Sequence, residues 1–312
     1  MNNMAKYGAV KRFKRAFNRD KILYAIIALP AIYYIIFCYI PLYGLTLSFL
    51  EVRVFRGFSS FATAKNVGFK YFVQYLTDPY FWLVTRNTLI ISVYSLIFSF
   101  PMPIIFALLL NELEHDRFKK VIQTVTYLPH FISTVVICGM IRSFFATDGI
   151  VNSLLNAFGI DSITFLSSPS MFRPIYIGTG IWQSFGWNSI IYLAALTSID
   201  TQLYEAAKLD GATRMQQIRY VSVPGILPTV SILLIMQLGR VLNVGYEKIL
   251  LLYNGATMEV ADVISTYVYR RGILDAKFSY GTAVGLFTAV INLILLVGAN
   301  TISRKISETS LW

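Results

Sequence analysis

The sequence predicts an all-α integral membrane protein with six transmembrane helices and both ends of the chain in the cytoplasm. Three observations predict this fold class: the composition, the number of long apolar stretches and the distribution of basic residues. Of the 312 residues, 56% are hydrophobic and only 14% are charged, whereas soluble domains carry about 25% charged residues. Both cysteines, Cys38 and Cys138, fall within apolar stretches, which argues against a disulfide framework and against a zinc site.

Six stretches are apolar and long enough to cross a bilayer, which requires roughly 20 residues of helix. Five of them contain no Asp, Glu, Lys or Arg, and the fifth in chain order contains Arg240 as its single charged residue. The expected spans are 22–50, 87–111, 121–141, 174–199, 220–246 and 278–303. Together they define one transmembrane domain, 22–303, between a basic leader, 1–21, and a tail, 304–312.

The counts of lysine and arginine predict the orientation, because cytoplasmic segments carry an excess of these residues. If both termini are cytoplasmic, the inner segments hold 15 basic residues and the longer outer segments hold 11. We therefore expect an inner N-terminus, and the net charge of +11 reflects topology rather than nucleic-acid binding. The leader, with Phe13 and Phe17 among its basic residues, fits an interfacial helix on anionic lipid and equally a plain topology signal.

The loop 200–219 between the fourth and fifth spans has the pattern of a helical hairpin. Asp200 suits the N-cap of a helix over 201–209, and Gly211 suits the left-handed position that ends such a helix. Three apolar residues of this helix recur at i, i+3 and i+4, so they form one stripe. They are Leu203, Ala206 and Ala207, and the two alanines allow another surface to approach the helix backbone closely.

A second short helix is expected over 212–220, before Pro224 and Pro228 mark the start of the fifth span. The same spacing also fits an ordinary loop between two spans, with an apolar stripe that dips into the lipid headgroups.

The hairpin also resembles the characteristic cytoplasmic loop of ABC-importer permease subunits. The family pattern is Glu-Ala-Ala, three residues, Gly, nine residues, Ile, one residue, Leu-Pro. The matching residues here are Glu205-Ala206-Ala207, Gly211 and Val221-Ser222-Val223-Pro224, with valine in place of both aliphatic residues. The Asp210-Gly211-Ala212 version is similar to the carbohydrate-importing, maltose-permease-like branch. Four further stretches resemble its complex oligosaccharide or polysaccharide members: 39–44, 242–247, 262–269 and 310–312.

The resemblance implies that the hairpin is a coupling helix that seats in a cleft on a cytoplasmic ATPase subunit. Glu205 would make a charge-assisted contact to that subunit, and Gly211 would set the bend between the two helices. Closure of the ATPase pair would then tilt the spans and alternate access to a central cavity. The residues implied in coupling are Leu203, Tyr204, Glu205, Ala206, Ala207, Asp210, Gly211, Ala212 and Pro224.

The resemblance also implies the partners: a second, homologous permease that forms a heterodimer, two ATPase subunits and an extracytoplasmic substrate-binding protein, all at a bacterial cytoplasmic membrane. The sequence contains no GxxxxGK[ST] phosphate-binding loop, so ATP and Mg would be used by the partner ATPases and this chain would carry no catalytic residue or cofactor. The two histidines, His115 and His130, have no acidic or cysteine cluster at metal-ligand spacing, so no metal site is expected.

A path for a sugar requires aromatic faces and polar groups, and polar residues at membrane depth usually face a cavity or the bundle interior. The fourth and fifth expected spans carry such residues: Trp182, Gln183, Trp187, Asn188, Gln237, Arg240 and Asn243. The last three recur every three residues, so they are expected on roughly one helix face. Alternatively, the polar groups hold helices together and the tryptophans anchor the chain at the membrane interface.

Arg240 is the most unusual of these residues, because an arginine near a helix centre costs about 2.5–3.5 kcal/mol on insertion scales. Two explanations fit: it binds an anionic sugar such as a uronic acid, or it pairs with a carboxylate on the partner permease.

Two other classes of protein are weaker alternatives. A secondary transporter or channel working alone is expected to show further ionisable residues within its spans, or inverted repeats. A membrane-embedded enzyme requires a nucleophile with an adjacent base. The sequence shows neither pattern.

Overall fold

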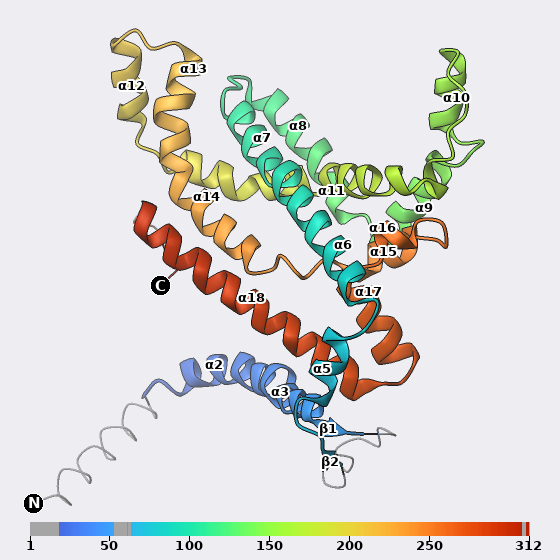
Figure 1. Ribbon diagram of the computed structural model, residues 1–312. Coiled ribbons are helices and arrows are strands. Elements are labelled where there is room, and N and C mark those ends of the chain that lie inside the picture. The colour runs from blue at the N-terminus through green and yellow to red at the C-terminus, as the bar shows by residue number, and fades with distance from the viewer. Residues whose placement is uncertain (1–18, 53–60, 62–63, 308–309, 312) are drawn as a thin grey trace, which may run out of the picture.

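The computed structural model describes residues 19–52, 61, 64–307 and 310–311, and this part of the chain is almost entirely helical (Figure 1). Its strands, β1 (Leu50–Glu51) and β2 (Lys65–Asn66), form one short antiparallel pair. Most of the basic leader, with its expected lipid contact, lies outside the described residues.

The first expected span is a helix of mixed type that extends away from the other helices. It consists of α2 (Lys21–Tyr34), the π-helical η1 (Ile35–Tyr39), α3 (Ile40–Leu42) and the 3-10 helix η2 (Tyr43–Phe49). Side chains of α2 are exposed on every side, whereas η2 packs against the long C-terminal helix.

The second expected span is a continuous apolar helix that begins earlier than predicted, at Phe81, and ends at Asn111. It contains α6 (Phe81–Tyr94), a π-helical turn η3 (Ser95–Ser99) and α7 (Pro101–Asn111), and it follows the short α5 (Lys70–Leu76). Pro101 lies in the first turn of α7, and the π turn before it accommodates the ring and the missing backbone N–H group.

The third expected span, 121–141, is not one straight helix. The chain forms α8 (Asp116–Tyr127), the 3-10 turn η4 (Leu128–Phe131) and α9 (Thr134–Phe144), and the two halves meet at an angle of 98°. Ser133 caps α9 by accepting a hydrogen bond from the backbone N–H of Val136. A new N-cap inside the apolar stretch therefore produces a bend that hydropathy alone does not predict.

The fourth expected span, 174–199, corresponds to α11 (Pro169–Thr197), which begins five residues earlier and ends two residues earlier than expected. It follows α10 (Ile150–Ala157) and the 3-10 turn η5 (Phe165–Ser167). This helix packs against α7 and α8. A Cβ atom at Gly186 would lie 2.3 Å from the backbone oxygen of Thr126, so glycine permits the close approach to α8.

The second half of the hairpin is not a separate short helix, contrary to the expectation for 212–220. The helix begins as α13 (Arg214–Gln217), continues through the π-helical η6 (Ile218–Ser222) and α14 (Val223–Leu238), and is continuous from Arg214 to Leu238. Pro224 lies in the first turn of α14, and Pro228 lies within it. The π turn again lies just before a proline, Pro224, and the helix continues through both prolines.

The fifth expected span, 220–246, ends early, because the helix stops at Leu238. An irregular segment leads to three short helices: α15 (Tyr246–Leu252), α16 (Met258–Ala261) and α17 (Ile264–Val268). The π-helical η7 (Tyr269–Leu274) then leads to α18 (Phe278–Ser307), which matches the sixth expected span.

By length and composition, four helices in the described part of the chain could cross a membrane, or five if the bent α8–α9 pair counts as one span. The helix α11 is long enough, but Gln183, Ser184 and Asn188 interrupt its apolar residues. Six spans with a cytoplasmic N-terminus therefore remain a prediction.

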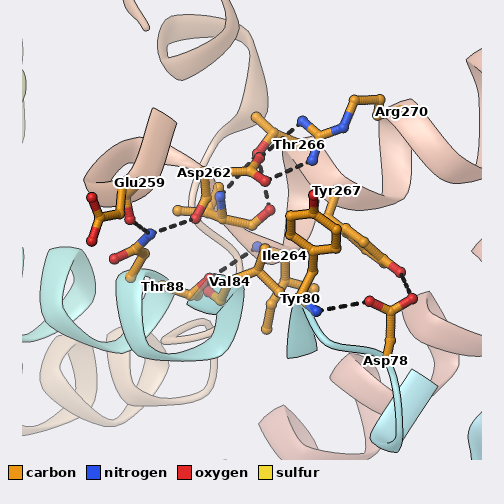
Figure 2. Close-up of polar contacts among 12 residues, drawn as sticks. Asp78, Tyr80, Val84, Thr88, Glu259, Asp262, Ile264, Thr266, Tyr267 and Arg270 are labelled. Atoms are coloured by element: carbon orange, nitrogen blue, oxygen red, sulfur yellow. Dashed lines mark hydrogen bonds and ion pairs between the residues drawn. The ribbon is translucent and has the colours of Figure 1, made fainter. Parts of the chain in front are cut away.

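Buried hydrogen bonds connect α16 and α17 to α6 (Figure 2). The Thr88 hydroxyl accepts a hydrogen bond from the backbone N–H of Ile264 at 3.0 Å. The Asn87 amide donates to the backbone oxygens of Glu259 and Asp262 at 2.8 and 3.0 Å. Because unpaired buried backbone groups are costly, these side chains fix the position of the short helices α16 and α17 on α6.

A polar cavity and an exposed helical hairpin

A cavity of about 500 Å³ lies between η3, α11 and the end of α14. Its walls are formed by apolar residues and by a set of hydroxyl, amide and basic side chains. The polar members are Ser95, Ser99, Tyr176, Gln183, Ser184, Asn188, Tyr192, Gln237, Arg240 and Lys248. Four of the residues that the sequence suggested for a sugar path thus lie together: Gln183 and Asn188 on α11, Gln237 in the last turn of α14, and Arg240 just after it.

The three polar residues expected on one face of the fifth span do not share a helix face. Gln237 is in the last turn of α14, whereas Arg240 lies in a turn and Asn243 in an irregular segment beyond it. Successive backbone hydrogen bonds, from Arg240 to Gln237 at 3.0 Å and from Asn243 to Arg240 at 2.8 Å, hold these turns. All three nevertheless line a second cavity of about 170 Å³, which shares Ser95, Tyr176, Gln237 and Arg240 with the first.

Side chains from three neighbouring elements satisfy the backbone of this irregular segment. The Ser92 hydroxyl donates to the backbone oxygen of Val241, and the Ser265 hydroxyl donates to that of Val244 at 2.7 Å. The Asn292 side chain accepts from the backbone N–H of Leu242 at 3.1 Å. Non-helical backbone is tolerated at membrane depth where protein groups satisfy it or where it lines a cavity, and this segment meets both conditions.

Two basic side chains, Arg240 and Lys248, line the larger cavity. The Lys248 ammonium group donates to the backbone oxygen of Tyr176 at 3.0 Å and lies 5.0 Å from the centre of the Tyr176 ring. Within the described residues, no Asp or Glu lines the cavity, and the ion pairs include neither Arg240 nor Lys248. The cavity therefore carries positive charge that the described chain does not neutralise.

Lys248 is not among the residues expected in the path, because the predicted topology places it in the outer segment 247–277. The early end of α14 and the turn after it bring α15 back against α11. No local pattern around Lys248 signals this return.

The two tryptophans do not line the cavity, and they are 43% (Trp182) and 38% (Trp187) exposed. The Trp187 ring stacks on the His130 ring, with centres 4.7 Å apart and planes 2° apart. Phe131 packs edge-on against the same indole at 5.2 Å. The structure thus places Trp187 at the bend between α8 and α9.

The hairpin begins with α12 (Thr201–Leu209), as expected. The Asp200 carboxylate caps it by accepting from the backbone N–H of Gln202 at 2.9 Å. Gly211 has a φ of +78°, which a left-handed C-terminal cap requires. Backbone hydrogen bonds from Gly211 to Lys208 at 3.1 Å and from Ala212 to Ala207 at 2.9 Å complete a Schellman motif.

The surface of α12 is largely exposed: Leu203 and Glu205 face solvent, and Leu209 is 90% exposed. Most of the residues that the motif implicates on α12 are therefore accessible to another protein, whereas Tyr204 and Ala207 are half-buried. Pro224 lies apart from them, within α14.

Comparison with known proteins identifies the family. Residues 87–308 match the model of the "binding-protein-dependent transport system inner membrane component" family. The polygalacturonan/rhamnogalacturonan transport system permease protein YteP of Bacillus subtilis is 41% identical over 94% of this chain and 91% of its own length. The protein LplB of the same organism is 39% identical over 95% of this chain and 93% of its own length.

Two solved structures have the same fold. One is a chain of a bacterial ABC transporter involved in the import of the acidic polysaccharide alginate, with a TM-score of 0.85 and 42% identity over 95% of this chain and 99% of that chain. The other is a chain of the alginate transporter in complex with a periplasmic protein that holds an alginate pentasaccharide, with a TM-score of 0.86 and 42% identity over 96% and 100%. The chain therefore belongs to the binding-protein-dependent transport system inner membrane components, the permeases of ABC transporters.

Proposed function

We propose that this chain is a permease subunit of an ATP-driven importer for acidic oligosaccharides or polysaccharide fragments. The observation that carries the proposal is the cavity in which Arg240 and Lys248 face no acidic lining residue of the described chain. The relatives named for alginate and for polygalacturonan transport support the same substrate class.

The chemistry of the cavity fits a uronic acid. An unpaired basic group away from water is costly, and the carboxylate of a uronate ring offsets that cost. Arginine presents a planar fork that can bind a carboxylate through two parallel hydrogen bonds. Gln183, Asn188 and Gln237 can donate to and accept from sugar hydroxyls.

The proposed assembly contains a second, homologous permease, two cytoplasmic ATPase subunits and an extracytoplasmic binding protein. In this arrangement the chain crosses a bacterial inner membrane six times, with both termini in the cytoplasm. ATP and Mg are used by the ATPase subunits. The exposed face of α12, with Glu205 on it, is the surface that seats on an ATPase subunit, and its exposure in the isolated chain supports that role.

Uptake into proteoliposomes that hold the complete transporter tests the substrate class. Trigalacturonate and a neutral trisaccharide are compared in the wild type and in Arg240→Gln. We expect Arg240→Gln to raise the KM for the acidic sugar about tenfold or more, the effect of losing a hydrogen bond to a charged group, and to leave neutral uptake unchanged. Arg142→Gln is a matched control, because Arg142 is exposed and lines none of these cavities. An equal loss for both sugars would instead indicate that Arg240 pairs with the partner permease.

A further inference from the structure

The helix α12 is joined to the start of the next helix by a hydrogen bond between two hydroxyl groups. Tyr204 Oη and Ser222 Oγ are 2.9 Å apart. Ser222 is 1% exposed, and Tyr204 is half-buried, whereas most other residues of α12 face solvent. Among the described residues, this is the only side-chain hydrogen bond between α12 and the helix that begins at Arg214.

Two further contacts brace the hairpin on either side of this bond, without involving α12 itself. The Gln217 amide donates to the backbone oxygen of Ala212 at 2.9 Å, just after the Gly211 turn. Before α12, Ile199 packs so closely on Gly225 that a Cβ atom there would lie 2.4 Å from the Ile199 side chain. The middle of the hairpin therefore depends on Tyr204 and Ser222.

An ion pair between the start of α13 and the loop before α8 is a weaker link. Arg214 pairs with Glu114 at 2.5 Å, but both side chains are largely exposed. Exposed ion pairs contribute about 0–1 kcal/mol, so this pair is a poor link between α13 and the loop that precedes α8.

Ser222 lies where the membrane helix is irregular. It is the last residue of the π-helical η6, directly before α14 and two residues before Pro224. Single π turns within α-helices occur frequently at functional sites, and proline removes one backbone hydrogen bond. A force applied at Ser222 therefore acts where the helix can change its geometry most easily.

We infer that the Tyr204–Ser222 hydrogen bond transmits the displacement of α12 to α14, which makes both residues positioning residues for energy coupling. The inference rests on the proposed function, because it assumes that an ATPase subunit binds the exposed face of α12. When that subunit moves, the hydroxyl pair carries the movement into η6 and so to the end of α14, where Gln237 and Arg240 line the cavity. Figure 1 shows α12 at one end of the structure, beside the continuous helix that leads to this region.

The test uses the complete transporter in proteoliposomes and measures three quantities: retention of the ATPase subunits, the basal ATPase rate, and the stimulation of that rate by substrate-loaded binding protein. Tyr204→Phe and Ser222→Ala each remove one hydroxyl group. We expect Ser222→Ala, at a residue outside the expected coupling set, to retain the ATPase subunits and the basal rate. Stimulation and uptake should fall about three- to tenfold in both variants, in line with the loss of one hydrogen bond. The double variant should be no worse than either single variant, because one interaction is lost in all three.

Tyr220→Phe is the matched control. Tyr220 lies on the same π turn and is exposed, so removal of its hydroxyl leaves the Tyr204–Ser222 bond intact. The inference is wrong if both test variants are stimulated like the wild type, if their effects add in the double variant, or if uptake falls only in proportion to lost ATPase. The proposed function fails separately, if the wild-type chain retains no ATPase that Glu205→Arg can release.

Discussion

The ammonium group of Lys248 lies 3.0 Å from the backbone oxygen of Tyr176, although 72 residues separate them in the chain. This bond joins α15 to α11 and holds a positive charge in the wall of the cavity that Arg240 also lines. The contact depends on the early end of α14, because a helix that continued to residue 246 would carry Lys248 away from α11. The break in the helix therefore brings the charge of Lys248 into the cavity, beside that of Arg240.

Replacement of Lys248 tests this charge separately from Arg240. Lys248→Gln keeps a polar side chain and removes the charge. We expect the KM for trigalacturonate uptake to rise about tenfold, since hydrogen bonds to charged groups are worth about 1.5–3 kcal/mol, while the KM for a neutral trisaccharide stays within twofold. Lys277→Gln is the control, because Lys277 is exposed and lines none of the cavities described above. Unchanged acidic uptake in Lys248→Gln would remove this residue from the site.

Substitutions at Gly211 test whether the left-handed cap of α12 is required for ATPase docking. A β-branched residue at a φ of +78° is strained by about 1–2 kcal/mol, so Gly211→Val should disturb the hairpin and reduce the amount of ATPase that co-purifies. Gly211→Asn, which tolerates the left-handed region, should retain the ATPase. Equal retention by the two variants would show that the turn geometry is not required for docking.

The buried Asp262–Arg270 pair is expected to stabilise the segment from α15 to α17, which carries Lys248 into the wall of the cavity. The Asp262 carboxylate is 1% exposed and accepts two hydrogen bonds from Arg270, at 2.6 and 3.1 Å (Figure 2). These hydrogen bonds raise the pKa of Arg270 above its usual value, so the guanidinium stays charged at any working pH.

Asp262→Ala leaves that guanidinium without its partner. We expect a loss of about 3 kcal/mol, the lower end of the range for a broken buried pair, because the Arg270 side chain is 26% exposed. The loss is measured as a lower unfolding midpoint in detergent. Asp275→Ala breaks the exposed pair with Arg271 and should change stability by less than about 1 kcal/mol. Similar losses in the two variants would contradict the role assigned to the buried pair.

The close approach of α11 to α8 gives a prediction about packing. Gly186→Ala places a methyl group against the backbone of Thr126, and the two helices must separate to admit it. Overpacking of this kind costs roughly 1–3 kcal/mol. Gly178→Ala on the same helix has no neighbouring atom within 4 Å and should be neutral or slightly stabilising. A neutral Gly186→Ala would mean that the helices are not in contact at this point.

Local signals predicted the first half of the hairpin well. The Asp200 cap, α12 and the Gly211 turn each depend on neighbouring residues, and the structure has all three. The prolines were misread, because Pro224 and Pro228 usually mark helix boundaries. Here a π turn lies just before Pro224, and the helix continues through both prolines. The tertiary environment that permits this leaves no signature in the local sequence.

The cavity was predictable only in part for the same reason. Polarity within an apolar stretch pointed to Gln183, Asn188, Gln237 and Arg240, all of which line it. The helical periodicity assumed for Arg240 and Asn243 was wrong, since Ser92, Asn292 and Ser265 satisfy the backbone of a segment that hydropathy assigned to a helix. These partners lie on other elements, so spacing along the chain could not indicate them.

The most direct test of the account is the uptake of labelled trigalacturonate into proteoliposomes that hold the complete transporter, with and without ATP, in the wild type and in Glu205→Arg. We expect uptake that requires ATP and the binding protein, and that is lost in Glu205→Arg together with the ATPase subunits. Uptake of the same sugar by this chain alone, without ATP and unchanged by Glu205→Arg, would contradict it.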